Sequence, residues 1–315
     1  MNKDKLIIGT RGSELALCQT NQVKSALLTA LPGLQVEIRT IQTTGDKILD
    51  TALSKIADKG LFTKEIENHL LDGSIDLAVH SFKDLPTAIP SGLTIAAIPL
   101  RADSADVLIS KNNLALDQLP TTAVVLTGSL RRRAQLLNIN PDLNVQDIRG
   151  NVPTRLRKLD ESDAQALVIA AAGLIRLGLQ NRITQRLNPA QFLPACGQGA
   201  LALEIRADDY QTRQLVAALD DPESRTTATA ERTVLHHLQG GCQIPIGAHA
   251  HITNQQLYLY ALLSDLEGRR LLTTYQVGPP DQPESLGRTA AEHLLAQGGR
   301  EIINQILPEP RGNIT

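Results

Sequence analysis

The chain has 315 residues, 42% hydrophobic and 20% charged, which is typical of a folded protein with two or three domains and excludes wholesale disorder. Aromatic residues make up only 2% and the net charge is −2, which disfavours nucleic-acid binding through stacked rings or a basic surface. Arg outnumbers Lys about two to one, a bias that either an anionic ligand or genomic base composition explains.

Strand-like and helix-like segments alternate through the first two-thirds of the chain. The expected strands are residues 5–10, 34–40, 75–80, 93–99, 107–110, 123–127, 144–148, 166–170 and 199–206. The expected helices are residues 13–31, with Ser13 as N-cap, 62–71, 130–137, 154–159, 174–179 and 211–219. Such alternation predicts mostly parallel sheets covered by helices. The polar segment 45–60 is either a mobile lid or a short surface helix.

The pattern changes after the stop signal Asp220-Asp221-Pro222. The remaining elements are a helix at 227–239, strands at 246–252, 257–264 and 270–277, and a final helix at 284–307. Consecutive strands joined by short polar turns predict a small antiparallel sheet with helices on one face. The expected fold class is therefore α/β, with two α/β domains followed by a small α+β C-terminal domain.

Several Arg residues follow predicted strands, at the edge where α/β sheets bind ligands. They are Arg11, Arg131, Arg132, Arg149, Arg155 and Arg176. One such Arg is usually a solvated side chain, but repetition at successive strands favours a site for an anion such as a carboxylate or phosphate.

The segment His80-Ser81-Phe82-Lys83-Asp84 closes another predicted strand. Lys83 and Asp84 would lie at the same edge as the Arg residues. A carboxylate there stabilises a cationic intermediate or moves protons, whereas the alternative is that Asp84 is only a helix N-cap.

Cys242 lies in a tight loop, Gly240-Gly241-Cys242-Gln243-Ile244-Pro245-Ile246-Gly247. Such a loop exposes a thiol, although a cysteine is more often a small buried hydrophobic residue, as we expect of Cys18. Cys196, in a glycine-rich turn, is ambiguous. His249 and His251 lack a third ligand, so no metal site is expected.

The N-terminal twelve residues do not form a signal peptide, and the longest apolar run, residues 166–175, is too short to span a bilayer. Three widely separated cysteines form no disulfide framework. We therefore expect a cytoplasmic protein without membrane or nucleic-acid partners.

Together, these motifs resemble the porphobilinogen deaminase family, and they run in family order across nearly the whole chain. They are Gly9-Thr10-Arg11-Gly12-Ser13, Thr44-Gly45-Asp46, Lys59-Gly60-Leu61-Phe62, Val79-His80-Ser81-Phe82-Lys83-Asp84, Gly128-Ser129-Leu130-Arg131-Arg132, Arg149-Gly150-Asn151, Leu193-Pro194-Ala195, Gly197-Gln198-Gly199-Ala200 and the Cys242 loop.

The resemblance implies a transferase of tetrapyrrole and heme biosynthesis with a dipyrromethane cofactor joined to Cys242 by a thioether. Four molecules of porphobilinogen, the substrate, are condensed head to tail onto this primer with release of ammonia, and hydroxymethylbilane is then hydrolysed off. By resemblance, Asp84 faces the pyrrole nitrogens, stabilises the azafulvenium cation and assists proton transfer.

The resemblance also assigns binding roles to the other motif residues. Besides Cys242, cofactor binding falls to Lys83, Asp84, Ser129, Arg131 and Arg132. Substrate binding falls to Arg11, Ser13, Arg149, Arg155 and Arg176. A mobile lid would carry Lys55, Lys59 and Phe62.

At the level of fold, the resemblance implies two domains like those of periplasmic binding proteins and a chain that returns to the first domain. Residues 1–99 and 200–219 would form domain 1, residues 100–199 domain 2, and residues 220–315 a third domain that carries Cys242. The family also favours a monomer.

The sequence departs from the family at a few positions. Gly128 stands where Ser is common, Glu14 where Pro is frequent and Cys18 where Trp is frequent. Arg133 follows the Arg pair at a position that the family does not fix, and we expect it at the surface.

Two other functions remain compatible with the residues alone. A solute-binding or sensor module with two lobes would use the Arg residues to grip a dianion, but it would leave Cys242 idle. A thiol enzyme forming an acyl intermediate would need a base near Cys242, where only His236 and His237 are close in sequence.

Overall fold

The computed structural model describes residues 3–47, 63–241 and 243–307. Its strands are β1 (Lys5–Arg11), β2 (Gln35–Ile41), β3 (Leu77–Ser81), β4 (Leu93–Ala97), β5 (Asp106–Ser110), β6 (Val124–Leu126), β7 (Asn144–Gln146), β8 (Ala166–Ala170), β9 (Gln185–Arg186), β10 (Leu201–Arg206), β11 (Ile246–Thr253), β12 (Gln256–Ser264) and β13 (Leu271–Gly278). Its helices are α1 (Glu14–Ala30), α2 (Thr44–Lys47), α3 (Lys64–Leu71), α4 (Leu130–Ile139), α5 (Val152–Glu161), α6 (Ala171–Arg176), α7 (Tyr210–Ala217), α8 (Pro222–His237), α9 (Pro283–Leu294) and α10 (Arg300–Ile306). Shorter helical turns are η2 (Phe82–Asp84), η3 (Leu116–Gln118), η4 (Gln180–Arg182) and the π-helical η5 (Leu295–Gly299).

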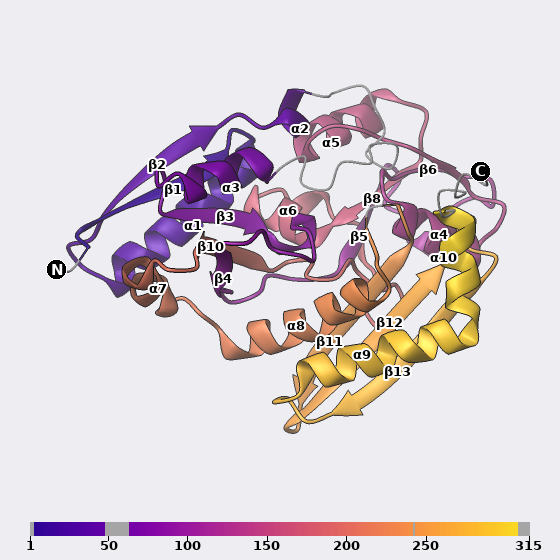
Figure 1. The fold of residues 1–315 in the computed structure, drawn as a ribbon. Coiled ribbons are helices and arrows are strands. Elements are labelled where there is room, and N and C mark those ends of the chain that lie inside the picture. The colour runs from indigo at the N-terminus through magenta and orange to yellow at the C-terminus, as the bar shows by residue number, and fades with distance from the viewer. Residues whose placement is uncertain (1–2, 48–62, 242, 308–315) are drawn as a thin grey trace, which may run out of the picture.

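These strands form three sheets (Figure 1). The first sheet has the order β2-β1-β3-β10-β4, the second β7-β6-β8-β5-β9, and the third is the antiparallel set β11-β12-β13. The chain therefore returns to the first sheet through β10 after completing the second. The expected fold class, α/β followed by α+β with an antiparallel sheet, is confirmed.

The expectation of mostly parallel sheets is confirmed only in part: four of the five strands in each larger sheet run in one direction, and one strand, β10 or β5, runs against them. In the first sheet β1 runs parallel to β2 and β3, but β10 is antiparallel to both of its neighbours. In the second sheet β6 runs parallel to β7 and β8, whereas β5 is antiparallel to β8 and β9. β5 and β10 each follow a segment that crosses between the two sheets, and local alternation carries no information about the direction in which such a strand enters.

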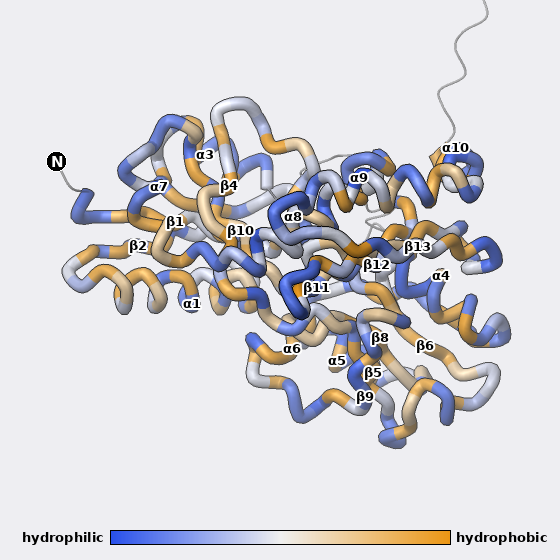
Figure 2. Tube along the Cα trace, turned by 90° about the horizontal axis from the view of Figure 1, so that it is seen from below, coloured by the Kyte–Doolittle hydropathy of each residue, from blue (hydrophilic) through white to orange (hydrophobic). Residues whose placement is uncertain are grey.

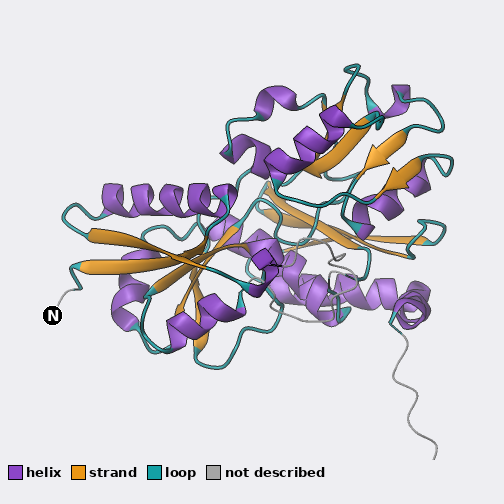
Figure 3. Cartoon of the chain, turned by 90° about the horizontal axis from the view of Figure 1, so that it is seen from above, coloured by secondary structure: helices purple, strands orange, loops and turns teal. Residues whose placement is uncertain are grey.

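Helices cover both faces of the first two sheets (Figure 3). Against the first sheet, Val23 and Leu27 of α1 pack on one face and Ile66 and Leu70 of α3 on the other. The second sheet is packed between Leu136 of α4 and helices α5 and α6. Hydrophobic residues gather on the central strands, as the colouring of β6 and β8 in Figure 2 shows.

Local capping chemistry sets where several helices begin. Ser13 caps α1, as predicted, by accepting a hydrogen bond from the Ala16 amide at 3.3 Å. Asp221 caps α8 by accepting one from the Ser224 amide at 2.8 Å, and Pro222 follows in the first turn, so α8 begins before the expected residue 227. Gly298, with φ +100°, interrupts the expected single C-terminal helix.

The third sheet packs against α8 and α9, which lie on one face of it as predicted. Its β12–β13 turn meets the second sheet's α4, since Asn138 Nδ2 donates to the Gly268 carbonyl at 2.9 Å. Arg133 forms an ion pair there with Glu267 at 3.0 Å, both side chains being partly exposed.

Candidate active site

The parallel strands bring most of the predicted residues to common sheet edges. β1 and β3 are parallel, so Arg11 and the Lys83–Asp84 pair lie at one edge of the first sheet. β6, β7 and β8 are parallel, so the segments carrying the predicted Arg residues leave the second sheet at one edge. These are Arg131, Arg132, Arg149, Arg155 and Arg176.

Asp106 is the centre of a buried charge cluster. Arg131 Nη1 donates to Asp106 Oδ2 at 2.8 Å and Arg132 Nε to Oδ1 at 2.9 Å, and both guanidinium side chains are about 5% exposed. Burial raises the pKa of Asp106, but the two Arg charges outweigh it and hold the pKa below its ordinary value. Asp106 therefore remains a carboxylate.

Gln198 connects this cluster to the first sheet. Its Nε2 donates to Asp106 Oδ1 at 2.8 Å, and its Oε1 accepts from Lys83 Nζ at 3.2 Å and from Arg132 Nη2 at 3.3 Å. Burial lowers the pKa of Lys83 to about 8, a shift that Asp84 opposes and the nearby Arg132 reinforces. We call Lys83, Arg131, Arg132, Asp106 and Gln198 the charge cluster.

Sequence reasoning missed Asp106 and Gln198, although both are fully buried. The available signal was a carboxylate at the start of an apolar strand and an amide inside a glycine-rich turn. Both features invite a buried hydrogen-bonding role.

The charge cluster holds three cations and one carboxylate, so its positive charge is in excess. Arg155 adds to it: burial lowers its pKa to about 10, and Arg132 and Arg149 act in the same direction. Its Nε donates to the Gly150 carbonyl at 2.7 Å. A buried positive excess of this kind favours a ligand that carries several carboxylates.

Asp84 ends the turn η2 that follows β3, so it does not cap a helix and that alternative is excluded. Its side chain is exposed. No residue in the described part of the chain donates a hydrogen bond to its carboxylate, which leaves both oxygens accessible to a ligand.

The two predicted serines cap helices. Ser129 accepts from the Arg132 amide at 3.4 Å, as Ser13 does from Ala16. Capping uses an acceptor lone pair, so each hydroxyl hydrogen is still available to a ligand. Next to Ser129, a Cβ on Gly128 would lie 2.6 Å from the Ile148 carbonyl oxygen, which explains why a larger residue does not fit this backbone.

Arg176 lies where α1, which packs on the first sheet, meets α6, which packs on the second. Its Nη2 donates to the Gly199 carbonyl at 2.8 Å, and its own carbonyl accepts from Cys18 Sγ at 2.9 Å. Burial lowers its pKa. Arg11 and Arg149 are partly buried, and Arg149 Nε is 4.0 Å from the Asp147 carboxylate.

Glu231 of α8 binds both segments that join the first two sheets, the one between β4 and β5 and the one between β9 and β10. It forms a bidentate ion pair with Arg101 at 2.8 and 2.9 Å and accepts from the Gly197 and Ala250 amides at 2.7 and 2.8 Å. The C-terminal part of the chain is thereby fixed to the segments that join the first two sheets.

Cys242 and the expected lid residues Lys55, Lys59 and Phe62 lie outside the described residues. Cys196 is buried, and burial raises the pKa of its thiol to about 12, so it is unsuited to act as a nucleophile.

Two family models match the chain. One, described as porphobilinogen deaminase, dipyromethane cofactor binding domain, matches residues 6–214, and the other, porphobilinogen deaminase, C-terminal domain, matches residues 225–296. The chain belongs to the porphobilinogen deaminase family.

Curated relatives agree with the family assignment. A porphobilinogen deaminase from Syntrophobacter fumaroxidans is 47% identical over 96% of this chain and 98% of its own length. One from Desulforudis audaxviator is 49% identical over the same shares. Porphobilinogen deaminase is a hydroxymethylbilane synthase, which is a transferase. Among solved structures, a TRAP periplasmic solute binding protein from Desulfovibrio salexigens is 10% identical with a TM-score of 0.42, covering 69% of this chain and 72% of that one.

The family's dipyrromethane cofactor fits the site on electrostatic grounds. Its pyrroles carry acetate and propionate groups, and the charge cluster supplies the buried positive excess that such carboxylates require. In the described residues there is no group of three or more side chains able to hold a metal ion, and no helix is long and apolar enough to cross a membrane.

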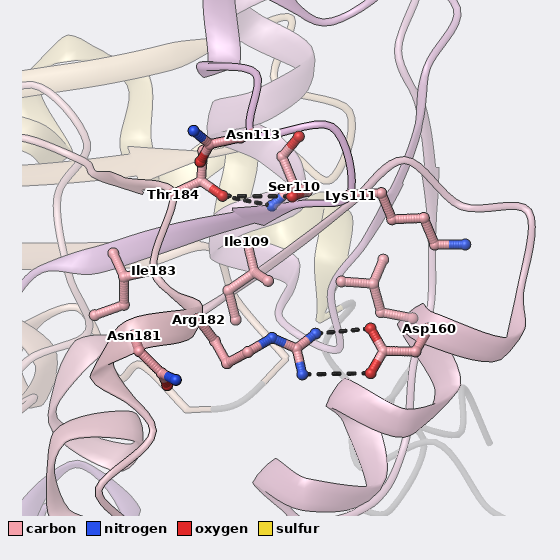
Figure 4. A pocket seen from close by; sticks show the side chains of 10 residues that line it. Ile109, Ser110, Lys111, Asn113, Asp160, Asn181, Arg182, Ile183 and Thr184 are labelled. Carbon is pink, nitrogen blue, oxygen red and sulfur yellow. Dashed lines mark hydrogen bonds and ion pairs between the residues drawn. The ribbon is translucent and has the colours of Figure 1, made fainter.

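Figure 4 shows a polar pocket of the second sheet that contains none of the family's motif residues. Arg182 forms a bidentate ion pair with Asp160 across it, at 2.7 and 3.3 Å. Among the residues that line this pocket, Lys111 is the only cation without a carboxylate partner, and it donates to the Ser162 carbonyl. This pocket is therefore a poor match for a polycarboxylate.

We expect Asp106→Asn to destabilise this family member strongly. The change leaves two buried guanidinium groups without a counter-charge, a loss of about 3–5 kcal/mol in the free energy of unfolding. Asp160→Asn, in the exposed pair with Arg182, is the matched control and should cost less than about 1 kcal/mol. Urea unfolding measures both, and equal losses would contradict the structural role of Asp106.

Lys83 should give the cofactor-free protein a characteristic pH dependence. Because its pKa is about 8 when folded and about 10.5 when unfolded, the unfolded state binds more protons between these values. The free energy of unfolding of Cys242→Ala protein should therefore rise from pH 8 to 10.5. The double variant with Lys83→Met should lack this component, and identical pH profiles for the two proteins would show that Lys83 is not perturbed.

Proposed function

We propose that this protein condenses four porphobilinogen molecules head to tail onto a dipyrromethane joined to Cys242 and then hydrolyses off hydroxymethylbilane. The observation that supports this most directly is the positive excess of half-buried Lys83 and buried Arg131 and Arg132 beside the exposed carboxylate of Asp84. A site of this composition suits a chain of pyrroles that carries many carboxylates and passes through cationic states.

The cofactor supplies a nucleophilic pyrrole carbon for the first condensation. Lys83, Arg131 and Arg132 would hold its carboxylates mainly through charge, because Asp106, Gln198 and carbonyl oxygens already occupy part of their donors. Ser129 would add a hydroxyl donor. Arg11, Ser13, Arg149, Arg155 and Arg176 would bind the acetate and propionate of the incoming substrate.

Asp84 would act on the substrate in two stages. Breaking the bond between the aminomethyl carbon and nitrogen releases ammonia and leaves a positive charge on the pyrrole, which the Asp84 carboxylate stabilises. A nucleophilic pyrrole carbon then attacks the methylene carbon of this cation to form a carbon–carbon bond, and the attacking pyrrole carbon loses its proton, which Asp84 can accept. In the final hydrolysis the bond between the tetrapyrrole and the primer would break once the primer's pyrrole carbon regains a proton, and water would add to the resulting cation with loss of a proton.

The organisation proposed for this function has three domains, residues 1–99 with 200–219, residues 100–199, and residues 220–315. The pairing of β10 with β3 and β4 supports the return of the chain to the first domain. We also propose a cytoplasmic monomer whose lid carries Lys55, Lys59 and Phe62.

The purified protein incubated with porphobilinogen tests the reaction. We expect ammonia and hydroxymethylbilane in a ratio of about four to one, the latter seen as porphyrin after oxidation. Consumption of porphobilinogen without ammonia, or no consumption by cofactor-bearing protein, would overturn the proposal.

A further inference from the structure

Arg232 of α8 binds the turn that carries Asp84. Its Nη1 donates to the carbonyls of Phe82 and Leu85, both at 3.1 Å, and its Nη2 donates to that of Pro86 at 2.6 Å. The guanidinium carbon also lies 4.3 Å from the centroid of the Phe82 ring. One side chain thus contacts the turn on both sides of Lys83 and Asp84.

This guanidinium pairs with none of the carboxylates in the described ranges. Other Arg residues buried nearby are neutralised, Arg101 by Glu231 and Arg131 by Asp106. Burial lowers the pKa of Arg232 to about 10, which still leaves it charged at neutral pH. Its donors are directed to the backbone at the start of η2 and directly after its end, which is the arrangement expected of a residue that orients a turn.

The turn has few hydrogen bonds of its own. η2 spans three residues, and the Leu85 amide returns to the Phe82 carbonyl at 3.3 Å. At its start, the Phe82 amide donates to the Ala200 carbonyl at 3.0 Å. The direction of the Asp84 side chain therefore depends on contacts from outside the turn, and Arg232 supplies three of them.

The helix that carries Arg232 is itself anchored. The preceding residue, Glu231, binds Arg101, Gly197 and Ala250, as described above. The C-terminal end of α8 leads within a few residues to Gly241, which directly precedes Cys242. A single anchored helix thus connects the turn of Asp84 to the loop of the cofactor cysteine.

We infer that Arg232 is a positioning residue, which fixes the orientation of the turn that carries Asp84 and so the direction in which the Asp84 carboxylate meets the substrate. The inference rests on the proposed roles of Asp84 and Cys242. Misplacing a reacting group by about 1 Å costs on the order of a hundredfold in rate, so a modest rotation of η2 is sufficient to slow the reaction.

The experiment compares Arg232→Met and Arg232→Lys with Arg225→Met. Arg225 is a matched control because it lies on the same helix and also donates to a backbone carbonyl, that of Ala96 at 2.9 Å, but this carbonyl belongs to β4, and Arg225 also pairs with Asp220. For each protein the covalent cofactor is measured by intact mass, the stability by Tm, and catalysis by kcat and KM.

Arg232→Met should retain the cofactor and a Tm close to that of Arg225→Met, while its kcat falls about thirtyfold to a hundredfold and its KM changes less than about threefold. Arg232→Lys should recover part of kcat, because an ammonium keeps the charge but reaches fewer of the three carbonyls. Arg225→Met should retain the kcat of the unaltered protein.

An unchanged kcat in Arg232→Met would overturn the inference. So would a kcat loss that matches a loss of cofactor or Tm, since that result indicates a structural role only. If Arg232→Met does not fold, Arg232→Lys decides by the same criteria. Failure of the proposed function is distinguishable, because the unaltered protein would then release no ammonia.

Discussion

Replacing Asp84 with alanine should leave a folded, cofactor-bearing protein that turns over at least about a hundredfold more slowly. The physical reason is that the exposed carboxylate at the end of η2 would be the group that compensates positive charge on the substrate and removes a proton. The residue has no structural partner among the described side chains that would be lost with it. Rates of ammonia release under saturating porphobilinogen measure the effect.

Asp142→Ala is the control for this change, since Asp142 is an exposed carboxylate near β7 and away from the predicted motifs. It should keep full activity. Near-normal turnover in Asp84→Ala would remove Asp84 from the chemistry and would leave the family's reaction to be performed by another group.

Cys242→Ala should abolish turnover rather than slow it. Every condensation in the proposed reaction starts from a primer joined to this thiol, so a protein without the thiol has no covalent attachment for the growing chain. Neither Cys18 nor Cys196 can substitute: the thiol of Cys18 donates to the Arg176 carbonyl, and that of Cys196 is buried with a raised pKa.

Cys18→Ala is the matched control, and it should retain turnover. Sustained release of ammonia and tetrapyrrole by Cys242→Ala would contradict the assignment of the cofactor to Cys242. The same assay applied to both variants separates loss of the primer from a general effect of removing a cysteine.

Much of the secondary structure could be predicted from local pattern. The apolar strands at the sheet centres and the cap Ser13 could be predicted from the sequence because capping and periodicity act over a few residues. The two-residue strand β9 was not, since two residues provide no period.

The long-range features were harder to predict. Resemblance, not periodicity, indicated that the chain returns through β10. Only part of the charge cluster could be predicted. Arg131 and Arg132 were found as repeated cations after strands, and Lys83 in the segment after another strand, but Asp106 and Gln198 were not found. Their partners lie 25 or more residues away, and a buried ion pair leaves no local signature.

The contact between Arg232 and the turn of Asp84 could not be predicted for the same reason. Its carbonyl acceptors, in η2 and directly after it, are about 150 residues away in the sequence and belong to the backbone, so no residue type marks them. Only the packing of α8 against the turn after β3 reveals the contact.

The intact mass of the purified protein tests the central claim most directly. Protein produced in cells able to make the primer should exceed its sequence mass by two pyrrole units, and the excess should persist on denaturation and be absent from Cys242→Ala. An unmodified mass for the unaltered protein, or the same excess in Cys242→Ala, would contradict the account.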